Sequence, residues 1–211
     1  ATLSNRGFFL RTFSICAGFV VLSGIIELPW SIYTGWWRET LYGRTSQSLA
    51  DFLGQSGLAL ALNTLFMGLF LTAVYGLIQR VGSRWWLWSG SLTAGSTALL
   101  LLLGPIAIEP LFNDYKTVPE GEVKDAVEAM AIEAGIPTDR IFMYDGSRQS
   151  NNFTANVSGI GSSARIAISD VALDAATLDE VKAVTGHEVG HYVLGHVWDI
   201  VAVLTVLVMV S

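Results

Sequence analysis

The sequence predicts a mainly α-helical membrane protein that carries a small α+β domain. Of its 211 residues, 52% are hydrophobic and only 14% are charged, a balance outside the usual range of soluble domains. Three apolar runs, at residues 8–28, 57–78 and 85–108, are each long enough to cross a hydrocarbon layer of about 30 Å as a helix. Charged residues return after residue 108, so we expect a membrane domain over 1–108 and a folded α+β domain over 109–199.

The first run is expected to be a retained span, because it is too long for a signal peptide and no small-residue cleavage pattern follows it. The segment 29–56 mixes Trp and Tyr with charged residues, which predicts that it lies along the membrane surface. The short connection 79–84 makes the second and third spans an antiparallel pair. The sequence has a single cysteine, Cys16, so a disulfide framework is excluded. Cys16 is interpreted as an unreactive residue that packs against other helices or faces lipid.

A fourth apolar run covers residues 200–211 and is too short to cross a bilayer as a helix. We therefore expect it to be the start of a truncated fourth span in the N-terminal part of a longer protein. The predicted location is a multi-pass integral membrane protein of the bacterial inner membrane or an endomembrane, with the lipid bilayer as a partner. Basic residues on the two sides nearly balance, which leaves the orientation open. The net charge of -6 argues against a nucleic-acid partner.

The elements of the α+β domain follow from local patterns. One face of a helix is indicated by apolar residues at helical spacing, with Pro119 in its first turn and Gly135 as its stop; these residues are Val123, Val127, Met130, Ala131 and Ala134. Residues 141–144 and 165–169 are expected to be short strands, and 153–157 could be another.

The last helix of the domain is expected over about 178–198. Thr177 followed by Glu180 forms a capping box, in which each side chain satisfies a free backbone N–H at the helix start.

The sequence TGHEVGHYVLGH within this helix contains the pattern H-E-x-x-H at His187, Glu188 and His191. Four helical residues rotate by about 400°, so the two imidazoles lie on one face roughly 6 Å apart, within reach of one zinc ion. Glu188 is turned by about 100° from His187 and can take a proton from water that the metal activates. The alternative is that the pattern arose by chance on a surface helix. The position of the motif within a capped helix argues against this alternative.

A catalytic zinc normally has three protein ligands and one open position. His196 lies about 7.5 Å further along a continuous helix and about 140° around it, so it is interpreted as a surface or packing residue. Glu180 and Asp199 are also too far along the axis to complete the site. The third ligand is therefore expected in a downstream part of the protein, as a glutamate on a later helix.

Beyond the zinc motif, several segments occur in an order that resembles the type 1 CAAX prenyl endopeptidases, the integral-membrane branch of metallopeptidase family forty-eight. These segments are ELPWSIYTGWWRETLYGRTSQS, PLFNDYKTVPEGEV, GIGSSARIAISDVAL and TGHEVGHYVLGH. The resemblance implies a fold of three transmembrane helices plus the start of a fourth with a small zincin-like (gluzincin) domain. It also implies one zinc ion per site, bound by His187 and His191, catalysis by Glu188, and a downstream glutamate ligand.

The resemblance also implies that the strand before the catalytic helix pairs with an extended substrate, through Thr154, Ala155 and Asn156. Relatives tend to have Asn-Ala where this chain has Thr154-Ala155. The alternative for this strand is ordinary sheet packing.

The function predicted from these observations is a zinc-dependent membrane metalloendopeptidase of the CAAX-processing type. Its expected substrate is a peptide or protein, with prenylated and membrane-bound substrates among the options. A membrane quality-control protease with the same chemistry is one alternative. A non-catalytic module that binds a partner or lipid is another, against which the retention of both histidines and of Glu188 counts.

Overall fold

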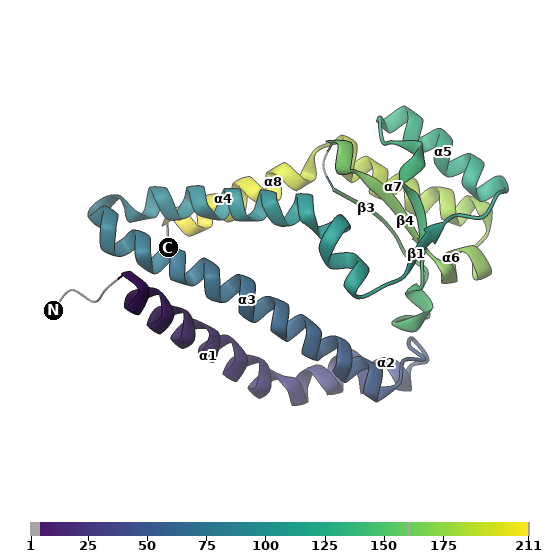
Figure 1. Ribbon diagram of the computed structural model, residues 1–211. Helices are drawn as coiled ribbons and strands as arrows, with labels where there is room; N and C mark the ends of the chain where they lie inside the picture. Colours follow the sequence, from purple (N-terminus) through teal and green to yellow (C-terminus); the bar gives the residue numbers. More distant parts are fainter. Residues whose placement is uncertain (1–4, 160, 211) are drawn as a thin grey trace. The chain divides into compact units, whose positions relative to one another are not determined.

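The computed structural model describes residues 5–159 and 161–210. It divides into two compact units: a helical unit of Ala1–Leu41, Ser48–Ser96 and Leu204–Ser211, and a sheet unit of Tyr42–Gln47 and Thr97–Val203. The predicted fold class, a mainly α membrane protein with a small α+β domain, is confirmed (Figure 1).

The helical unit is built from long apolar helices. In chain order its segments are α1 (Asn5–Ser31), the π-helical η1 (Ile32–Trp37), α2 (Arg38–Leu41), α3 (Leu49–Val81), the 3-10 turn η2 (Gly82–Arg84) and the first part of α4 (Trp85–Leu103). Within residues 5–159 and 161–210, two continuous helical stretches, Gly7–Leu41 and Leu49–Leu111, are long and apolar enough to cross a membrane, and the bent pair α7 and α8 would make a third. The second stretch includes the turn at η2, where the chain doubles back (Figure 1).

The helices extend beyond the predicted apolar runs, and the segment 29–56 is mostly helical. Helix α1 continues through Pro29, and η1 and α2 follow it directly. Helix α3 begins eight residues before residue 57, because the hydroxyl of Ser48 caps it by accepting a bond from the N–H of Asp51. Hydropathy locates the part of a helix that lies in hydrocarbon, whereas caps and turns determine where the helix ends.

Helices α1 and α3 pack antiparallel, and each helix has a glycine that leaves a notch for a side chain of the other. A Cβ atom on Gly24 would lie 2.6 Å from the side chain of Leu60, and one on Gly68 would lie 2.9 Å from that of Phe13. Each glycine therefore admits a large side chain of the other helix against its backbone, as small residues do between membrane helices. Cys16 is buried, so its predicted packing role fits its environment.

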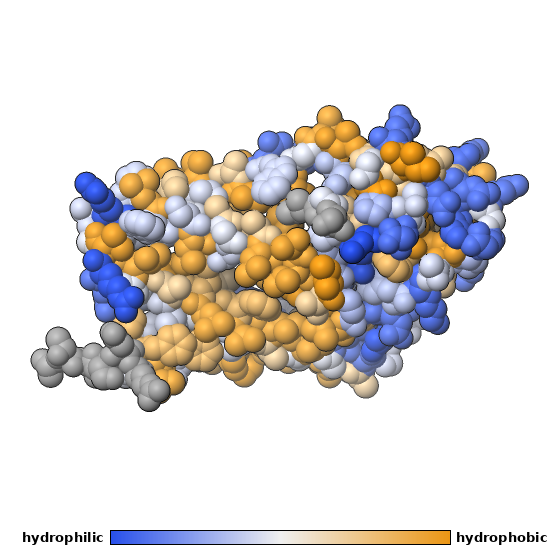
Figure 2. All heavy atoms as spheres, turned by 45° about the horizontal axis from the view of Figure 1, so that its top comes forward, coloured by the Kyte–Doolittle hydropathy of each residue, from blue (hydrophilic) through white to orange (hydrophobic). Residues whose placement is uncertain are grey.

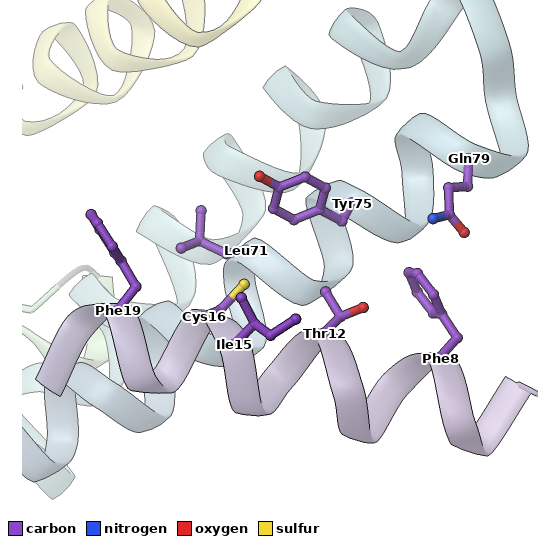
Figure 3. Close-up of a pocket in the computed structure, with 8 residues that line it drawn as sticks. All are labelled: Phe8, Thr12, Ile15, Cys16, Phe19, Leu71, Tyr75 and Gln79. Atoms are coloured by element: carbon purple, nitrogen blue, oxygen red, sulfur yellow. The ribbon is translucent and has the colours of Figure 1, made fainter. Parts of the chain in front are cut away.

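The two helices also leave an apolar groove of about 560 Å³ (Figure 3). Its lining comes from α1 and α3: Phe8, Thr12, Ile15, Cys16, Phe19, Leu71, Tyr75 and Gln79. Figure 2 shows apolar side chains over the visible part of the long helices. Mainly hydrophilic side chains cover the visible part of the sheet unit. Such exposed apolar side chains are expected for helices whose solvent is lipid.

The sheet unit contains one four-stranded sheet with the order β1-β2-β4-β3. Its strands are β1 (Tyr115–Thr117), β2 (Ile141–Tyr144), β3 (Ala155–Ser158) and β4 (Arg165–Ser169). Strands β2 and β4 are parallel, whereas β1 and β3 pair antiparallel with β2 and β4. The predicted strands at 141–144 and 165–169 are found, the third predicted strand begins two residues later than expected, and β1 was not predicted.

Two helices cover one face of this sheet. They are α5 (Glu122–Ala134) and α7 (Leu178–Val193), and the fully buried Ile166 and Ile168 of β4 lie in the core that they form. Burying each such side chain contributes about 1.5–3 kcal/mol. The helix predicted from apolar spacing is α5; it ends at Gly135 in the left-handed conformation as expected. Pro119, however, lies before the helix, which begins at Glu122.

The remaining segments connect these elements. The structure has α6 (Asp170–Ala175) and α8 (His196–Val210), together with the π-helical η3 (Gly104–Ile108) and the 3-10 turns η4 (Glu109–Leu111), η5 (Thr138–Arg140), η6 (Gly146–Arg148) and η7 (Gly161–Ser163). Helix α7 begins at Leu178 as predicted but ends at Val193, five residues before the predicted end, because Gly195 adopts φ +70°.

Candidate active site

The start of α7 is formed by the capping box predicted from the sequence. The hydroxyl of Thr177 accepts a bond from the N–H of Glu180, and the carboxylate of Glu180 accepts one from the N–H of Thr177. These hydrogen bonds lower the pKa of Glu180 below its usual value. Glu180 therefore has the capping role expected of it.

One face of α7 anchors the helix and the other carries the metal-binding motif. Val181, Thr185 and Val189 are buried at spacings of four residues and turn toward the core. His187 and His191 each follow a buried residue by two positions, which places them about 200° around the helix. The rigid packing of one face thus fixes the position of two exposed imidazoles on the other.

The two imidazoles converge on one point. Their Nε2 atoms are 3.0 Å apart, and the ring planes are perpendicular with centroids 4.6 Å apart. Two zinc–nitrogen bonds of about 2.05 Å at a tetrahedral angle would separate the nitrogens by about 3.3 Å. The pair therefore fits one zinc ion with little adjustment. Among residues 5–159 and 161–210, however, no group of three or more His, Cys, Asp and Glu residues could hold a metal.

A cavity of about 220 Å³ lies beside this pair within the sheet unit. Glu188 and His191 of α7 line it together with Val157, Ser158 and Gly159 at the end of β3 and Glu109 at the start of η4. The remaining lining comes from Leu100, Leu101, Gly104, Pro105, Tyr192 and Val197. The motif carboxylate and a histidine thus share a small, mostly apolar cavity with the end of a strand.

Strand β3 presents one edge that no other strand pairs with in the part of the chain that the structure describes. The carbonyl of Thr154 accepts a bond from the N–H of Ser169, so the backbone of Thr154 points toward β4. Backbone groups alternate in direction along an antiparallel strand. Those of Asn156 therefore also point toward β4, whereas those of Ala155 and Val157 point toward the free edge.

This geometry separates the three residues predicted to bind substrate. Ala155 directs its backbone outward, while the backbones of Thr154 and Asn156 are directed toward β4. The hydroxyl of Thr154 is 2.5 Å from that of Tyr144, so its side chain interacts within the sheet. Val157 was not singled out from the sequence; the two-residue period of the strand is the signal that would have identified it.

A second group of polar residues adjoins the cavity. The carboxylate of Glu109 accepts bonds from the guanidinium of buried Arg165 at 2.5 Å and from the hydroxyl of Tyr115 at 3.1 Å. The guanidinium also lies 4.0 Å from the centroid of the Tyr115 ring. Burial, and then the charge of Glu109, raise the pKa of Tyr115 well above its usual range. This group links the start of η4 to β1 and β4, and sequence reasoning missed it.

His196 does not lie where a continuous helix would place it. Its Nδ1 atom is 2.6 Å from Nδ1 of His191, because α7 ends at Val193 and α8 begins at His196. The continuous helix assumed for this position is therefore wrong, whereas the interpretation of His196 as a surface or packing residue that does not share the metal stays a prediction. The glycine at position 195 was the available sequence signal, since glycine commonly ends a helix in the left-handed conformation.

Comparison with protein families agrees with this geometry. Residues 2–114, more than half of the chain, match a family described as CAAX prenyl protease N-terminal, five membrane helices, and residues 117–211 match peptidase family M48. The chain belongs to peptidase family M48. The family predicted from the sequence is confirmed, and membership of this family identifies the chain as integral to the membrane.

Individual relatives of this M48 chain are distant but match most of its length. A protein named uncharacterized metalloprotease YhfN of Bacillus subtilis is 28% identical over 190 residues, which are 90% of this chain and 44% of the relative. The CAAX prenyl protease 1 homolog of Oryza sativa is 28% identical, over 96% of this chain and 48% of the relative. The M48 chain thus spans less than half the length of these relatives.

The crystal structure of S. mikatae Ste24p has the same fold as this M48 chain. The two superpose with a TM-score of 0.84 at 24% sequence identity, over 95% of this chain and 48% of the other. At this identity the comparison supports the fold, and the chemistry is argued from the residues of the site.

Proposed function

We propose that this chain contributes the zinc-binding helix of a membrane metalloendopeptidase. The observation that carries the proposal is the convergence of the Nε2 atoms of His187 and His191 beside a cavity lined by Glu188 and the end of an edge strand. In this proposal the third ligand is a glutamate on a later helix of the protein, an assignment that the family resemblance supports. A zinc ion held there would supply Lewis-acid chemistry, polarising a peptide carbonyl and making water a stronger acid.

Substrate binding in this proposal uses the edge of β3. An extended peptide would add a strand there by pairing with the outward backbone groups of Ala155 and Val157, which recognises the peptide main chain and not its side chains. The scissile bond would then lie along the cavity that Glu188 and His191 line. Each backbone bond contributes about 0.5–1.5 kcal/mol.

Glu188 is the proposed general base and acid. Glu188 is half-buried and lines the cavity, so in this proposal it lies beside the scissile bond and is not a metal ligand. It would take a proton from the attacking water and hold it on a carboxylate oxygen. It would then deliver this proton to the leaving amine nitrogen as the peptide bond breaks.

The substitution Glu188→Gln tests this role, because it keeps the shape of the side chain and removes its basicity. We expect cleavage to fall by at least about 100-fold, the lower end of the contribution of general acid–base catalysis, while about one zinc ion per molecule is retained. His187→Ala is the matched control and should lose the metal as well as the activity. Cleavage that persists in Glu188→Gln would overturn the proposal.

The proposed substrate is a CAAX-type prenylated peptide, as the names of several relatives suggest. The exposed apolar surface of the long helices supports a substrate delivered through the membrane. Comparing cleavage of a farnesylated peptide with that of the same peptide without the lipid tests this choice. A clear preference for the farnesylated peptide is expected, whereas equal rates would favour a quality-control protease.

A further inference from the structure

The junction between α7 and α8 is a defined bend in the chain. The N–H of Leu194 bonds to the carbonyl of Gly190, the N–H of Gly195 bonds to that of Tyr192, and Gly195 adopts φ +70°. A residue with a side chain adopts this left-handed conformation only with backbone strain. The axes of the two helices differ by 54° across this break.

This bend brings His196 to His191. In an uninterrupted helix the two side chains would be about 140° apart around the axis. In the structure their Nδ1 atoms are 2.6 Å apart and their ring centroids are 4.9 Å apart, with 59° between the planes. His196 is half-buried at the first position of α8, while His191 is exposed.

His191 thus makes a different contact with each of its two ring nitrogens. Its Nε2 faces Nε2 of His187 at 3.0 Å, on the side where a metal fits, and its Nδ1 faces His196. An imidazole that binds a metal through Nε2 carries its proton on Nδ1 and needs an acceptor for it. Among the described residues, the structure shows one hydrogen-bond partner for this Nδ1, and that partner is His196.

We propose that His196 is a positioning residue for the metal site. The Nδ1–H of His191 donates to the unprotonated Nδ1 of His196, which keeps the lone pair of His191 on Nε2 and holds the ring toward His187. His196 then carries its own proton on Nε2. This inference deepens the proposed function and rests on it, because it assumes that His187 and His191 bind zinc.

Two substitutions at position 196 separate hydrogen bonding from packing. His196→Phe keeps an aromatic ring and removes the acceptor, whereas His196→Asn removes the ring and keeps an oxygen acceptor near the position of Nδ1. Zinc affinity of the full-length protein in detergent is measured by competition with a chelator. We expect a loss of about 10- to 100-fold in His196→Phe, and an affinity within about threefold of the wild type in His196→Asn.

The visible spectrum of the cobalt-substituted protein is a second readout, because it reports ligand geometry without requiring activity. The His196→Phe spectrum is expected to change, and the His196→Asn spectrum to match the wild type. Gly195→Ala, which leaves the histidine in place but opposes the bend, should weaken zinc binding in the same direction. If His196→Phe does not fold, His196→Leu replaces it as the variant without an acceptor.

Two results would overturn this inference: wild-type affinity and spectrum in His196→Phe, or an equal loss in both substitutions. In either case the wild type would still bind zinc, and the proposed function would stand. Absence of zinc binding by the wild type would instead refute both.

Discussion

Arg165 is the residue whose environment differs most from what its position in the sequence indicates. It lies in a short, mostly apolar strand, yet its guanidinium is buried against Glu109 and the ring of Tyr115. A buried charge is costly unless it is paired, so removing one partner leaves the other uncompensated. The pair therefore joins the start of η4 to the sheet at the wall of the proposed active site.

Replacing this guanidinium is expected to destabilise the protein strongly. Arg165→Met keeps much of the side-chain volume and leaves Glu109 without its cation, at an expected cost of about 3–5 kcal/mol. Lys124→Met is the matched control, because Lys124 makes its ion pairs with Glu120 and Glu128 at the surface, where such pairs contribute little to stability. Thermal unfolding in detergent measures both. Equal melting temperatures for the two variants would contradict the assigned role of Arg165.

At the scale of elements, the features that the sequence predicted are those determined by residues close together along the chain. The histidines and the glutamate share one helix, so their spacing alone brings them together, and the short apolar runs of β2 and β4 identified both strands. Strand β1 was missed because its three residues include a lysine and show no apolar alternation. The contact of His196 depends on the φ angle of one glycine. The pair of Glu109 and Arg165 joins positions 56 residues apart, which no local pattern encodes.

The capping box of α7 should make the stability of the folded protein depend on pH. The pKa of Glu180 is lower in the folded protein than in the unfolded chain, so its carboxylate stabilises the fold above the unfolded pKa of about 4.3. That contribution is lost as the pH falls through the lower, folded value. We expect Glu180→Gln to lower the melting temperature at pH 7 and to have a smaller effect near pH 3. An equal effect at both pH values would contradict the assignment.

Because one edge of β3 is free, we expect the strand to tolerate a proline substitution at Val157. The N–H of Val157 points away from β4, so Val157→Pro should fold but lack one donor for the substrate. Val157→Thr keeps the N–H and a similar side-chain shape and is the control. With a peptide substrate, Val157→Pro is expected to raise KM by about 2- to 10-fold, the equivalent of one backbone hydrogen bond. Unchanged KM in both variants would argue against strand pairing of the substrate.

At the scale of the whole molecule, the two units have different surfaces. In the helical unit large apolar side chains are exposed, among them Phe19 at 67% and Ile26 at 69%, whereas the core of the sheet unit is buried between the sheet and two helices. Surfaces of the first kind are stable only against hydrocarbon, and a core of the second kind forms in water. The chain therefore joins a part folded by lipid packing to a part folded by the hydrophobic effect.

Removing the metal should affect the stability of the whole protein. A ligand that binds only the folded state stabilises it by about 2.7 kcal/mol at a concentration one hundred times its dissociation constant. A chelator is therefore expected to lower the melting temperature of the zinc-loaded wild type, and added zinc to restore it. The double substitution His187→Ala, His191→Ala should melt at one temperature with or without chelator. A shift in that variant would mean that the chelator acts elsewhere.

The glycine notches of α1 and α3 have a mechanical consequence. Gly24 receives Leu60 and Gly68 receives Phe13, so each helix carries one recess and one projection. A slide by a single turn, about 5.4 Å, would drive both projections against backbone at once. The two helices can therefore move together as one rigid body, but they cannot slide along each other.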